Sequence, residues 1–420
     1  MRHGISVLLV SACGALLPAS SSEHARLGTT FTLPSGNATP LRQLDSVLPG
    51  IDVLLRDSIH LVQGKRIGLL TNQTGIDASG VSTIDRLAHA PGVRLVALFA
   101  PEHGIRGAAR PGETMRDTVL GTADSVDAPT GLPIYSLYGP RRAPTAAELA
   151  RLDVLLVDLQ DVGARPFTFV STVVLALRAA AAARRRVVVL DRPDPLGGCV
   201  VQGPILDTAY ASYIGMLPVP LRHGMTIGEL ARFADARLHL EADLVVVPVR
   251  GWHRCDWFDR TGLTWVRPSP NLPDLEAAAW YPGTVLFEAT NLSVGRGTEA
   301  PFRQVGAPWL RAGPVLQAMR ARYRMALEAV RFTPHAPGDG KYDGVEIAGV
   351  RLPPFDHARG NAVRDALRLL RTIAALYPRQ LRVDTLGLER RLGVPSWSAD
   401  TWDADRARFL AERAAYLLYH

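Results

Sequence analysis

The stretch DVLLVDL, residues 153–159, decides the fold, because it is an almost unbroken apolar run between aspartates. Similar runs recur along the chain at residues 66–72, 93–100, 133–138, 186–191 and 243–249. Continuous apolar strands are typical of a sheet that is buried on both faces, whereas half-exposed strands alternate with polar residues. We therefore expect a parallel sheet that is covered by helices on both faces.

Helical patterns alternate with these runs, at residues 167–186 and 225–240. Thr226 and Glu229 have the spacing of a capping box at the start of the second helix. This alternation predicts an α/β fold in which residues 46–268 form a doubly wound, Rossmann-like parallel-sheet domain.

The pattern changes over residues 269–420. An apolar segment predicts a strand that enters Glu288. The further elements that we expect are a helix at 312–329, a strand at 344–352, and helices at 361–376 and 404–419. The mixed order predicts a smaller α+β C-terminal domain.

The composition allows a large core, since 47% of the 420 residues are apolar, and it carries a net charge of +7. Almost all basic residues are Arg, with Lys only at Lys65 and Lys341, and they are scattered along the chain. Scattered arginines indicate a compositional bias and not a stripe that follows phosphates, so we expect no nucleic-acid partner.

Residues 1–25 have the pattern of an export signal, and residues 26–45 read as a linker. The apolar part, Ile5 to Leu17, is too short to cross a bilayer. Val10-Ser11-Ala12-Cys13 resembles a lipobox, which would make a lipid on Cys13 the only membrane attachment; cleavage between Ser20 and Ala25 is the alternative. A misassigned start upstream of a cytosolic protein is a third interpretation. We expect an exported protein of the periplasm or cell envelope.

Two further cysteines, Cys199 and Cys255, carry no metal-ligand spacing. In an oxidising compartment they could pair, and otherwise they are small buried residues.

Polar residues follow most strands of the expected sheet. Parallel sheets bind ligands beyond the carboxyl ends of their strands, so these residues are candidates for a site. They are Asn72, Gln73, Glu102, His103, Arg106, Asp158, Gln160, Asp161, Arg165, Asp191, Arg192 and Asp194. Such opposed charges favour a polyhydroxylated or anionic substrate, since Arg forks suit carboxylates. For Asp194 and Gln73, capping or turn roles are the simpler interpretation.

Cofactor and metal motifs are missing from the sequence. No G-x-G-x-x-G follows the first strand, and no phosphate-binding loop, G-x-S-x-G or H-E-x-x-H occurs. The G-x-G within residues 293–302 lies outside the sheet domain and is a weak signal. We therefore expect no cofactor and no metal, and a nucleotide-dependent enzyme is disfavoured.

Carboxylate chemistry remains, and Glu102 is the best candidate for a proton donor. It follows a buried strand and lies between Pro101 and Gly104, where partial desolvation would keep its proton near neutral pH. His103 is an alternative acid or base, although a lone His in a loop is more often a packing residue.

A second polar run, residues 287–302, suggests a loop that closes on a ligand. Its candidate substrate-binding residues are Glu288, Asn291, Arg296 and Glu299. An ion pair between Arg296 and Glu299 that merely holds the loop is an equal alternative. The nearby aromatic residues, Trp280, Tyr281, Phe302 and Trp309, would either stack on sugar faces or pack in the core.

Several long motifs occur in one order: GLLTNQTG, LFAPEHGIRG, VDLQDVGARPFTFVST, VLDRPDPLGG and YPGTVLFEATNLSVGRGTEAPF. In these motifs the chain resembles the NamZ-type exo-β-N-acetylmuramidases, a family of peptidoglycan hexosaminidases, from about Gly64 to the C-terminus. One departure is Asp343, where family members often carry a Cys.

The resemblance implies hydrolysis of terminal β-1,4-linked N-acetylmuramic acid from the non-reducing end of peptidoglycan fragments, in a cleft between the two domains. It places the family's catalytic Glu on Glu102 and its Tyr partner on Tyr281. The lactyl carboxylate of muramic acid would explain an Arg-rich cleft, with Arg165, Arg192 and Arg296 as candidate contacts.

The nucleophile or base stays open among four carboxylates: Asp158, Asp161, Asp191 and Glu288. The alternative function is a catalytically silent muropeptide-binding envelope protein, for which the same polar cleft would suffice. An intact motif around Glu102 favours the enzyme.

Overall fold

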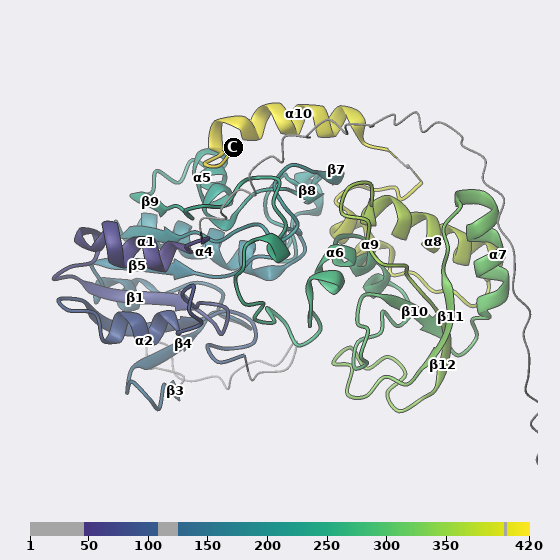
Figure 1. Cartoon of the computed structure of the whole chain (residues 1–420), viewed down its shortest axis with the longest axis horizontal. Helices are drawn as coiled ribbons and strands as arrows, with labels where there is room; N and C mark the ends of the chain where they lie inside the picture. The colour runs from purple at the N-terminus through teal and green to yellow at the C-terminus, as the bar shows by residue number, and fades with distance from the viewer. Residues whose placement is uncertain (1–45, 108–124, 399–400) are drawn as a thin grey trace, which may run out of the picture. The chain divides into compact units, whose positions relative to one another are not determined.

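The computed structural model describes residues 46–107, 125–398 and 401–420, which belong to one compact unit (Figure 1). The predicted signal peptide and linker, residues 1–45, lie outside the described residues, as does Cys13. None of the helices in the described part of the chain has the length and apolar character needed to span a bilayer.

A seven-stranded sheet confirms the predicted α/β class. Its order is β3-β4-β2-β1-β5-β6-β9, and all neighbours are parallel except the edge pair β3 and β4. The strands are β1 (Arg66–Thr71), β2 (Arg94–Ala100), β3 (Ser125–Val126), β4 (Pro133–Ser136), β5 (Val154–Asp158), β6 (Arg186–Leu190) and β9 (Leu244–Val247). The order reverses direction between β1 and β5, which is the point where open α/β sheets bind ligands.

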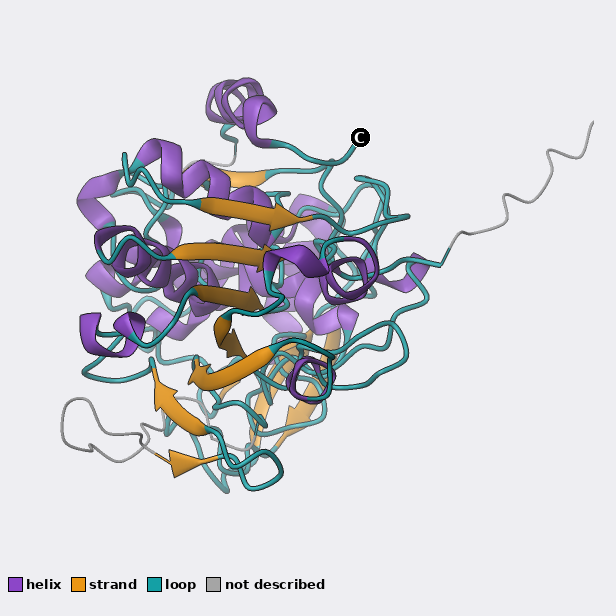
Figure 2. Ribbon diagram, turned by 90° about the vertical axis from the view of Figure 1, so that its left-hand side faces the viewer, coloured by secondary structure: helices purple, strands orange, loops and turns teal. Residues whose placement is uncertain are grey.

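Helices cover both faces of this sheet, as Figure 2 shows around the orange strands. On β5, Val154 and Leu156 pack in one apolar cluster, and Leu155 and Val157 pack in the other. The first cluster includes α1 (Gly50–Asp57) and α2 (Thr83–Ala88), and the second includes α4 (Thr168–Ala182) and α5 (Ile227–Arg237). Burial on both faces is why the strands are apolar without alternation.

The capping box that begins α5 is confirmed. The Thr226 hydroxyl accepts from the backbone N of Glu229, and the Glu229 carboxylate accepts from the backbone N of Thr226. Shorter elements complete this part: α3 (Ala146–Ala150), the hairpin of β7 (Gln202–Ile205) and β8 (Pro220–Arg222), and the 3₁₀ turns η1 (Ile59–Leu61), η2 (Thr208–Tyr210) and η3 (Phe258–Arg260).

The C-terminal part is α+β, as predicted. Its antiparallel sheet has the order β10-β12-β11, formed by β10 (Gln304–Ala307), β12 (Ile347–Arg351) and β11 (Glu328–Phe332). Its helices are α6 (Leu275–Thr284), α7 (Ala312–Tyr323), α8 (Ala362–Leu376), α9 (Thr385–Leu392) and α10 (Asp403–Arg413), with 3₁₀ turns η4 (Val285–Ala289) and η5 (Ala414–Tyr416). Helices α6 and α8 approach so closely that a Cβ on Gly283 would lie 2.0 Å from the Ala362 carbonyl oxygen.

Two predictions in this part are wrong. The apolar segment before Glu288 is not a strand, because α6 continues directly into the 3₁₀ turn η4. The helix expected over 312–329 ends at Tyr323, where Arg324 takes a left-handed φ of 56°. The next residues pair with β12 as β11, so tertiary pairing overrides local helix propensity.

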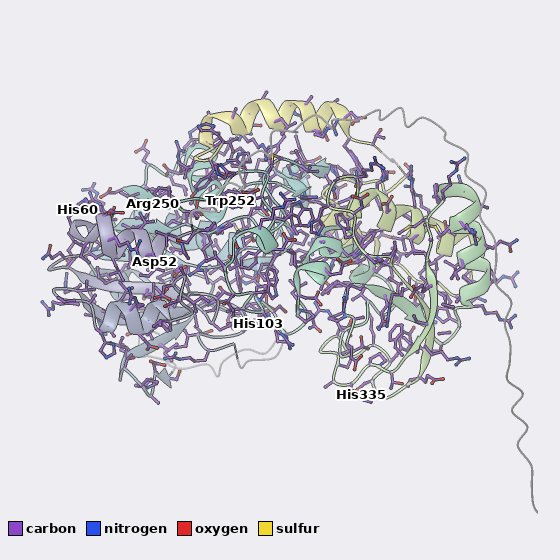
Figure 3. The ribbon with its side chains drawn as sticks, in the orientation of Figure 1. Asp52, His60, His103, Arg250, Trp252 and His335 are labelled. Atoms are coloured by element: carbon purple, nitrogen blue, oxygen red, sulfur yellow. A yellow bond between two sulfur atoms is a disulfide. The ribbon has the colours of Figure 1, made fainter. Side chains whose placement is uncertain are left out.

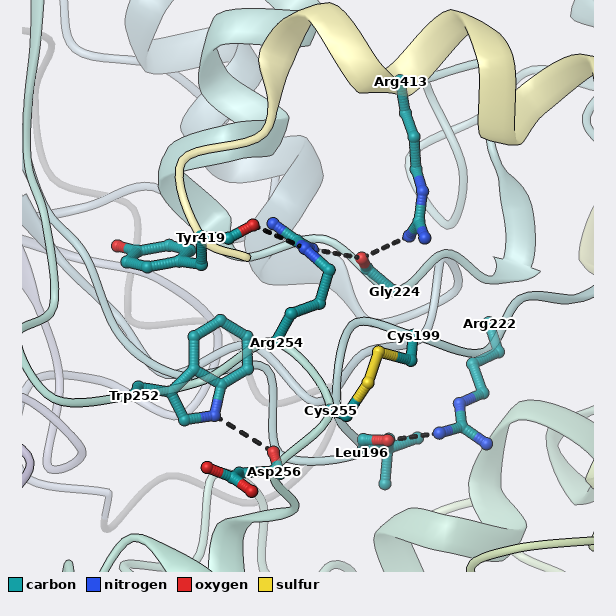
Figure 4. The surroundings of a disulfide bond; sticks show 10 residues. All are labelled: Leu196, Cys199, Arg222, Gly224, Trp252, Arg254, Cys255, Asp256, Arg413 and Tyr419. Atoms are coloured by element: carbon teal, nitrogen blue, oxygen red, sulfur yellow. Dashed lines mark hydrogen bonds between the residues drawn. A yellow bond between two sulfur atoms is a disulfide. The ribbon is translucent and has the colours of Figure 1, made fainter. Parts of the chain in front are cut away.

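The chain end returns to the sheet domain. The Tyr419 hydroxyl donates to Asp191 at 2.6 Å, and the backbone N of Arg254 donates to the His420 carbonyl at 3.2 Å. Figure 1 shows α10 beside α5, and Arg413 at its end donates to the Gly224 carbonyl (Figure 4). The last residues of the predicted C-terminal domain thus pack on the N-terminal one.

A disulfide joins Cys199 to Cys255, which decides between the two alternatives for these thiols. The Cα atoms are 5.0 Å apart, and the bond links the segments that follow β6 and β9 (Figure 4). Arg254, next to Cys255, donates to the Tyr419 carbonyl at 2.9 Å and forms a buried ion pair with Glu229. The bond therefore lies beside the contacts that hold the chain end.

We expect the double variant Cys199→Ser/Cys255→Ser to lose about 2 to 4 kcal/mol of unfolding free energy, because the bond closes a loop of 56 residues. Urea denaturation followed by fluorescence measures this loss. Wild type in dithiothreitol should match the variant, and the variant should not respond to the reductant. A wild type that is insensitive to reductant, with a variant of equal stability, would contradict the prediction.

Candidate active site

One pocket of about 530 Å³ is lined by both parts of the chain, a volume in the range of ligand sites. The sheet domain contributes Glu102, Tyr138, Arg142, Pro166, Thr168, Ser212, Tyr213 and Ile214. The C-terminal part contributes Tyr281, Glu288, Arg296, Asp384, Gly387, Arg390 and Arg391. Of the predicted residues, the structure thus brings together Glu102, Tyr281, Glu288 and Arg296.

Glu102 lies just beyond the carboxyl end of β2, in a turn closed by the Gly104 backbone N and the Pro101 carbonyl. Its carboxylate accepts a 2.7 Å hydrogen bond from the Thr168 hydroxyl and another from the Tyr138 hydroxyl. Burial, followed by the charge of Glu102, raises the pKa of Tyr138, so this hydroxyl stays neutral. Hydroxyls can donate to a carboxylate and accept from a carboxylic acid. Both partners therefore suit a group that releases and regains a proton.

Tyr281 faces the same pocket from α6 and is almost entirely buried. Its ring makes edge contacts with Phe167 and Phe302, at centroid distances of 6.1 and 4.8 Å. Burial, and then the charge of Glu288, raises the pKa of Tyr281. The hydroxyl is a neutral donor, and its position is set by packed aromatic rings.

Glu288 lines the pocket as part of a cluster of ion pairs. Arg296 donates to it through Nε at 2.8 Å and also through Nη2, and Arg391 approaches its second oxygen at 3.5 Å. Burial alone would raise the pKa of Glu288, but the charges of Arg296 and Arg391 outweigh it and leave the pKa below its usual value. Glu288 is therefore ionised and does not serve as a proton donor.

The sequence left open an ion pair between Arg296 and Glu299 that would hold the loop. This interpretation is wrong, because Arg296 pairs with Glu288. Glu299 is exposed and lies outside the pocket lining. Asn291 is also outside it, and its side chain bonds the Gln380 carbonyl and the Arg382 backbone N. On the same loop, Gly297 pairs with the backbone of His335, which Figure 3 labels on the C-terminal part.

Most predicted residues at the strand ends are buried in structural contacts. Asp158 pairs with Arg192, which also bonds the Ile76 carbonyl at 2.6 Å. Asp191 accepts from Thr226 and Tyr419, and burial raises the pKa of Asp191 to about 6. These contacts correct the expectation that the three side chains face the substrate.

Five amide and carboxylate side chains make contacts within their own loops or with neighbouring ones. Asn72 accepts from the backbone N and hydroxyl of Thr74, and Gln160 donates to the Pro193 carbonyl. Asp161 accepts from the Gly163 backbone N and lies 3.3 Å from His223. Asp194 accepts from the Leu196 backbone N, which is the turn role expected of it, and Gln73 bonds the Arg267 carbonyl. The hollow beside Gln160 and Arg192 has only about 10 Å³, enough for a water and not for a sugar.

His103 and Arg106 do not line the pocket. His103 is buried beside Glu102 with a left-handed φ of 74° (Figure 3). Arg106 pairs with Asp127 at 3.0 Å. The ion pair of Arg106 thus holds the loop that carries Glu102, and neither residue is in the lining of this pocket.

Arg165 is the clearest correction. Its guanidinium is buried and donates to four carbonyl oxygens: those of Pro204, Val219, Arg391 and Leu392. Burial lowers the pKa of Arg165 to about 9. The side chain therefore joins the loop after β5 to the end of α9, which carries Arg390 and Arg391, and it has no exposed surface for a carboxylate.

Sequence reasoning missed several pocket residues. Tyr138 and Arg142 follow β4, so the rule applied to the other strand ends would have found them. Arg390 and Arg391 had no such signal, because α9 reaches the pocket only through tertiary contacts. Within the described ranges, no three His, Cys, Asp or Glu side chains gather as ligands for a metal.

The fold and the pocket define a Rossmann-like protein with a saccharide-sized site of carboxylates, tyrosines and arginines. The protein-family model described as "Exo-beta-N-acetylmuramidase NamZ, N-terminal" matches residues 67–276. The family model of the C-terminal part matches residues 279–419. The chain belongs to the NamZ family of exo-β-N-acetylmuramidases, as its motifs predict.

A curated relative from Bacillus subtilis (strain 168), the peptidoglycan beta-N-acetylmuramidase NamZ, is 40% identical over 353 residues. This match covers 84% of the present chain and 83% of the relative. Two crystal structures of DUF1343 family proteins from Bacteroides fragilis NCTC 9343 are similar to it, with TM-scores of 0.80 and 0.69. Each is 30% identical and covers 89% of this chain and 99% of its own.

We expect Arg165→Met to lower the unfolding free energy by about 3 kcal/mol or more, because it leaves buried carbonyls without donors. Arg178→Met, at an exposed position on α4, is the matched control and should change stability by less than about 0.5 kcal/mol. Urea denaturation provides both values. An Arg165→Met variant of normal stability, whose KM rises only for lactyl-bearing substrates, would restore the ligand role.

Proposed function

We propose that this protein is an exo-acting glycoside hydrolase that releases terminal β-1,4-linked N-acetylmuramic acid from the non-reducing end of peptidoglycan fragments. The family membership and the muramidase activity for which the Bacillus subtilis relative is named support this substrate. The observation that carries the proposal is the position of Glu102, which lines the shared pocket beside two neutral hydroxyls and together with Tyr281.

In the proposed reaction, Glu102 gives its proton to the glycosidic oxygen as the bond from that oxygen to C1 breaks. The leaving sugar departs as an alcohol, and positive charge develops on the ring. The resulting Glu102 carboxylate is held by the hydroxyls of Thr168 and Tyr138. It then takes the proton of the water that completes hydrolysis, which returns the site to its starting state.

The other groups of the pocket position the substrate in this proposal. Tyr281 offers a neutral hydroxyl from the C-terminal part. Glu288 is the one carboxylate among the four candidates for a base or nucleophile that lines the pocket. Because it is paired with Arg296 and Arg391, we assign it an electrostatic and positioning role.

We also propose that the protein is exported to the periplasm or cell envelope, either as a soluble form or with a lipid on Cys13. The disulfide supports export, since such bonds persist mainly in oxidising compartments.

We expect Glu102→Gln to lower kcat on a chromogenic β-N-acetylmuramide by about 10² to 10⁴-fold with little change in KM, because the amide keeps the shape and cannot donate the proton. Glu299→Gln, an exposed acid outside the pocket, is the matched control and should behave as wild type. Full activity in Glu102→Gln would refute the acid assignment. No release from the muramide by wild type, with retained binding, would favour the silent binding protein.

For export, we expect the mature protein isolated from cells to lack the first residues and to contain no free thiol at Cys199 or Cys255. Mass spectrometry after alkylation, with and without reduction, measures both properties. A Cys13→Ser variant distinguishes the two forms: it should leave the membrane fraction only if Cys13 carries a lipid. An intact N-terminus with alkylated thiols would indicate a cytosolic protein.

A further inference from the structure

The arginines of the pocket differ in whether a carboxylate neutralises them. The pocket contains four, Arg142, Arg296, Arg390 and Arg391. Arg296 and Arg391 share Glu288 as their partner, so each already faces a carboxylate before any substrate enters, and one positive charge remains between the two. Arg142 and Arg390 form no ion pair with the residues that the structure describes.

Arg142 belongs to the side of the pocket that holds Glu102. Its guanidinium lies 4.2 Å from the centre of the Tyr213 ring, and its Nε donates to the Gly139 carbonyl at 3.3 Å. Its charge lowers the pKa of Tyr138 and Tyr213, while Glu102 raises the pKa of both. Arg142 thus lies among the groups around Glu102, where it can stabilise the carboxylate that proton donation leaves.

Arg390 lies on the opposite side, in the last turn of α9, and its side chain is exposed to the pocket. The nearby acid of the pocket, Asp384, caps the start of α9 by accepting from the Gly387 backbone N at 3.0 Å. Leu388 and Leu392 bury the other face of the helix. The helix is also held at its end by Arg165, which bonds the Arg391 and Leu392 carbonyls. Among the residues that the structure describes, the Arg390 guanidinium therefore has no acidic partner, and its backbone is fixed.

The charge of the C-terminal part reinforces this asymmetry. Residues 46–268 contain 24 basic and 22 acidic side chains, and residues 269–420 contain 20 basic and 16 acidic ones. The wall that carries Arg390 thus belongs to the part of the chain with the larger excess of positive charge. Such an excess favours the approach of an anionic substrate.

We propose that Arg390 binds the lactyl carboxylate of the terminal muramoyl residue and thereby determines specificity against N-acetylglucosamine, which has a hydroxyl at that position. This inference rests on the proposed function. A guanidinium fork matches a carboxylate in geometry and charge, and Arg390 is the arginine on this wall whose charge has no acidic partner among the described residues. It replaces Arg165 and Arg192, which are buried in other contacts, in this role.

The test compares Arg390→Gln with wild type on a chromogenic β-N-acetylmuramide and on the same compound with its lactyl carboxyl converted to an amide. We expect the variant to lower kcat/KM for the acid by about 10 to 100-fold, mainly through a higher KM. For the amide, kcat/KM should change by less than about 3-fold. Arg390→Lys should recover part of the loss, since it keeps the charge and loses the fork. Arg379 is an exposed arginine outside the pocket, so Arg379→Gln removes the same charge and should leave kcat/KM for both substrates unchanged.

An equal loss on the acid and the amide would overturn the inference while leaving the proposed function intact. A second measurement keeps the two separable: calorimetric binding of N-acetylmuramic acid and of N-acetylglucosamine to wild type and Arg390→Gln. If wild type hydrolyses no muramide but binds N-acetylmuramic acid in an Arg390-dependent way, the activity fails and the carboxylate contact stands. Binding of N-acetylmuramic acid that is unchanged in Arg390→Gln would refute the contact.

Discussion

The buried guanidinium of Arg165 is the interaction on which the rest of the site depends. It bonds carbonyls of the β7 to β8 region on one side and the last carbonyls of α9 on the other. A buried guanidinium is costly unless its N–H groups form hydrogen bonds. The hydrogen bonds of Arg165 to these carbonyls therefore hold the two segments in one arrangement. The end of α9 is thereby positioned against the sheet domain, and the pocket acquires its second wall.

The same principle explains why so many charged residues at the strand ends are not available to a ligand. Asp158 and Arg192 neutralise each other within the sheet edge, and Asp191 receives the hydroxyls of Thr226 and Tyr419. The second of these hydroxyls belongs to the chain end, so the C-terminal tail is fastened to the sheet through this carboxylate. The disulfide and the Arg254 contacts lie beside this attachment. Charge at the edge of the sheet thus serves mainly to assemble the chain.

The pocket itself separates two kinds of environment. Around Glu102 the direct partners are the hydroxyls of Thr168 and Tyr138, which tolerate both protonation states of a carboxyl group. Around Glu288 the partners are arginines, which keep the carboxylate ionised. Two acids of one pocket are therefore suited to different tasks by their neighbours, and Arg390 adds a cation that is left for the substrate.

The sequence by itself determined the sheet, because continuous apolar runs can be satisfied only by burial on both faces, and it determined the family through long motifs. It also singled out Glu102 and Tyr281, which the structure brings into the lining of one pocket. Only the tertiary structure decided which arginines face the pocket. Arg165 and Arg390 are chemically identical in a sequence, and they differ only in what surrounds them after folding: four backbone carbonyls for the first and an open pocket for the second. The segment before Glu288 shows the same limit, because its apolar residues suit a strand or a buried helix, and packing against α8 selects the helix.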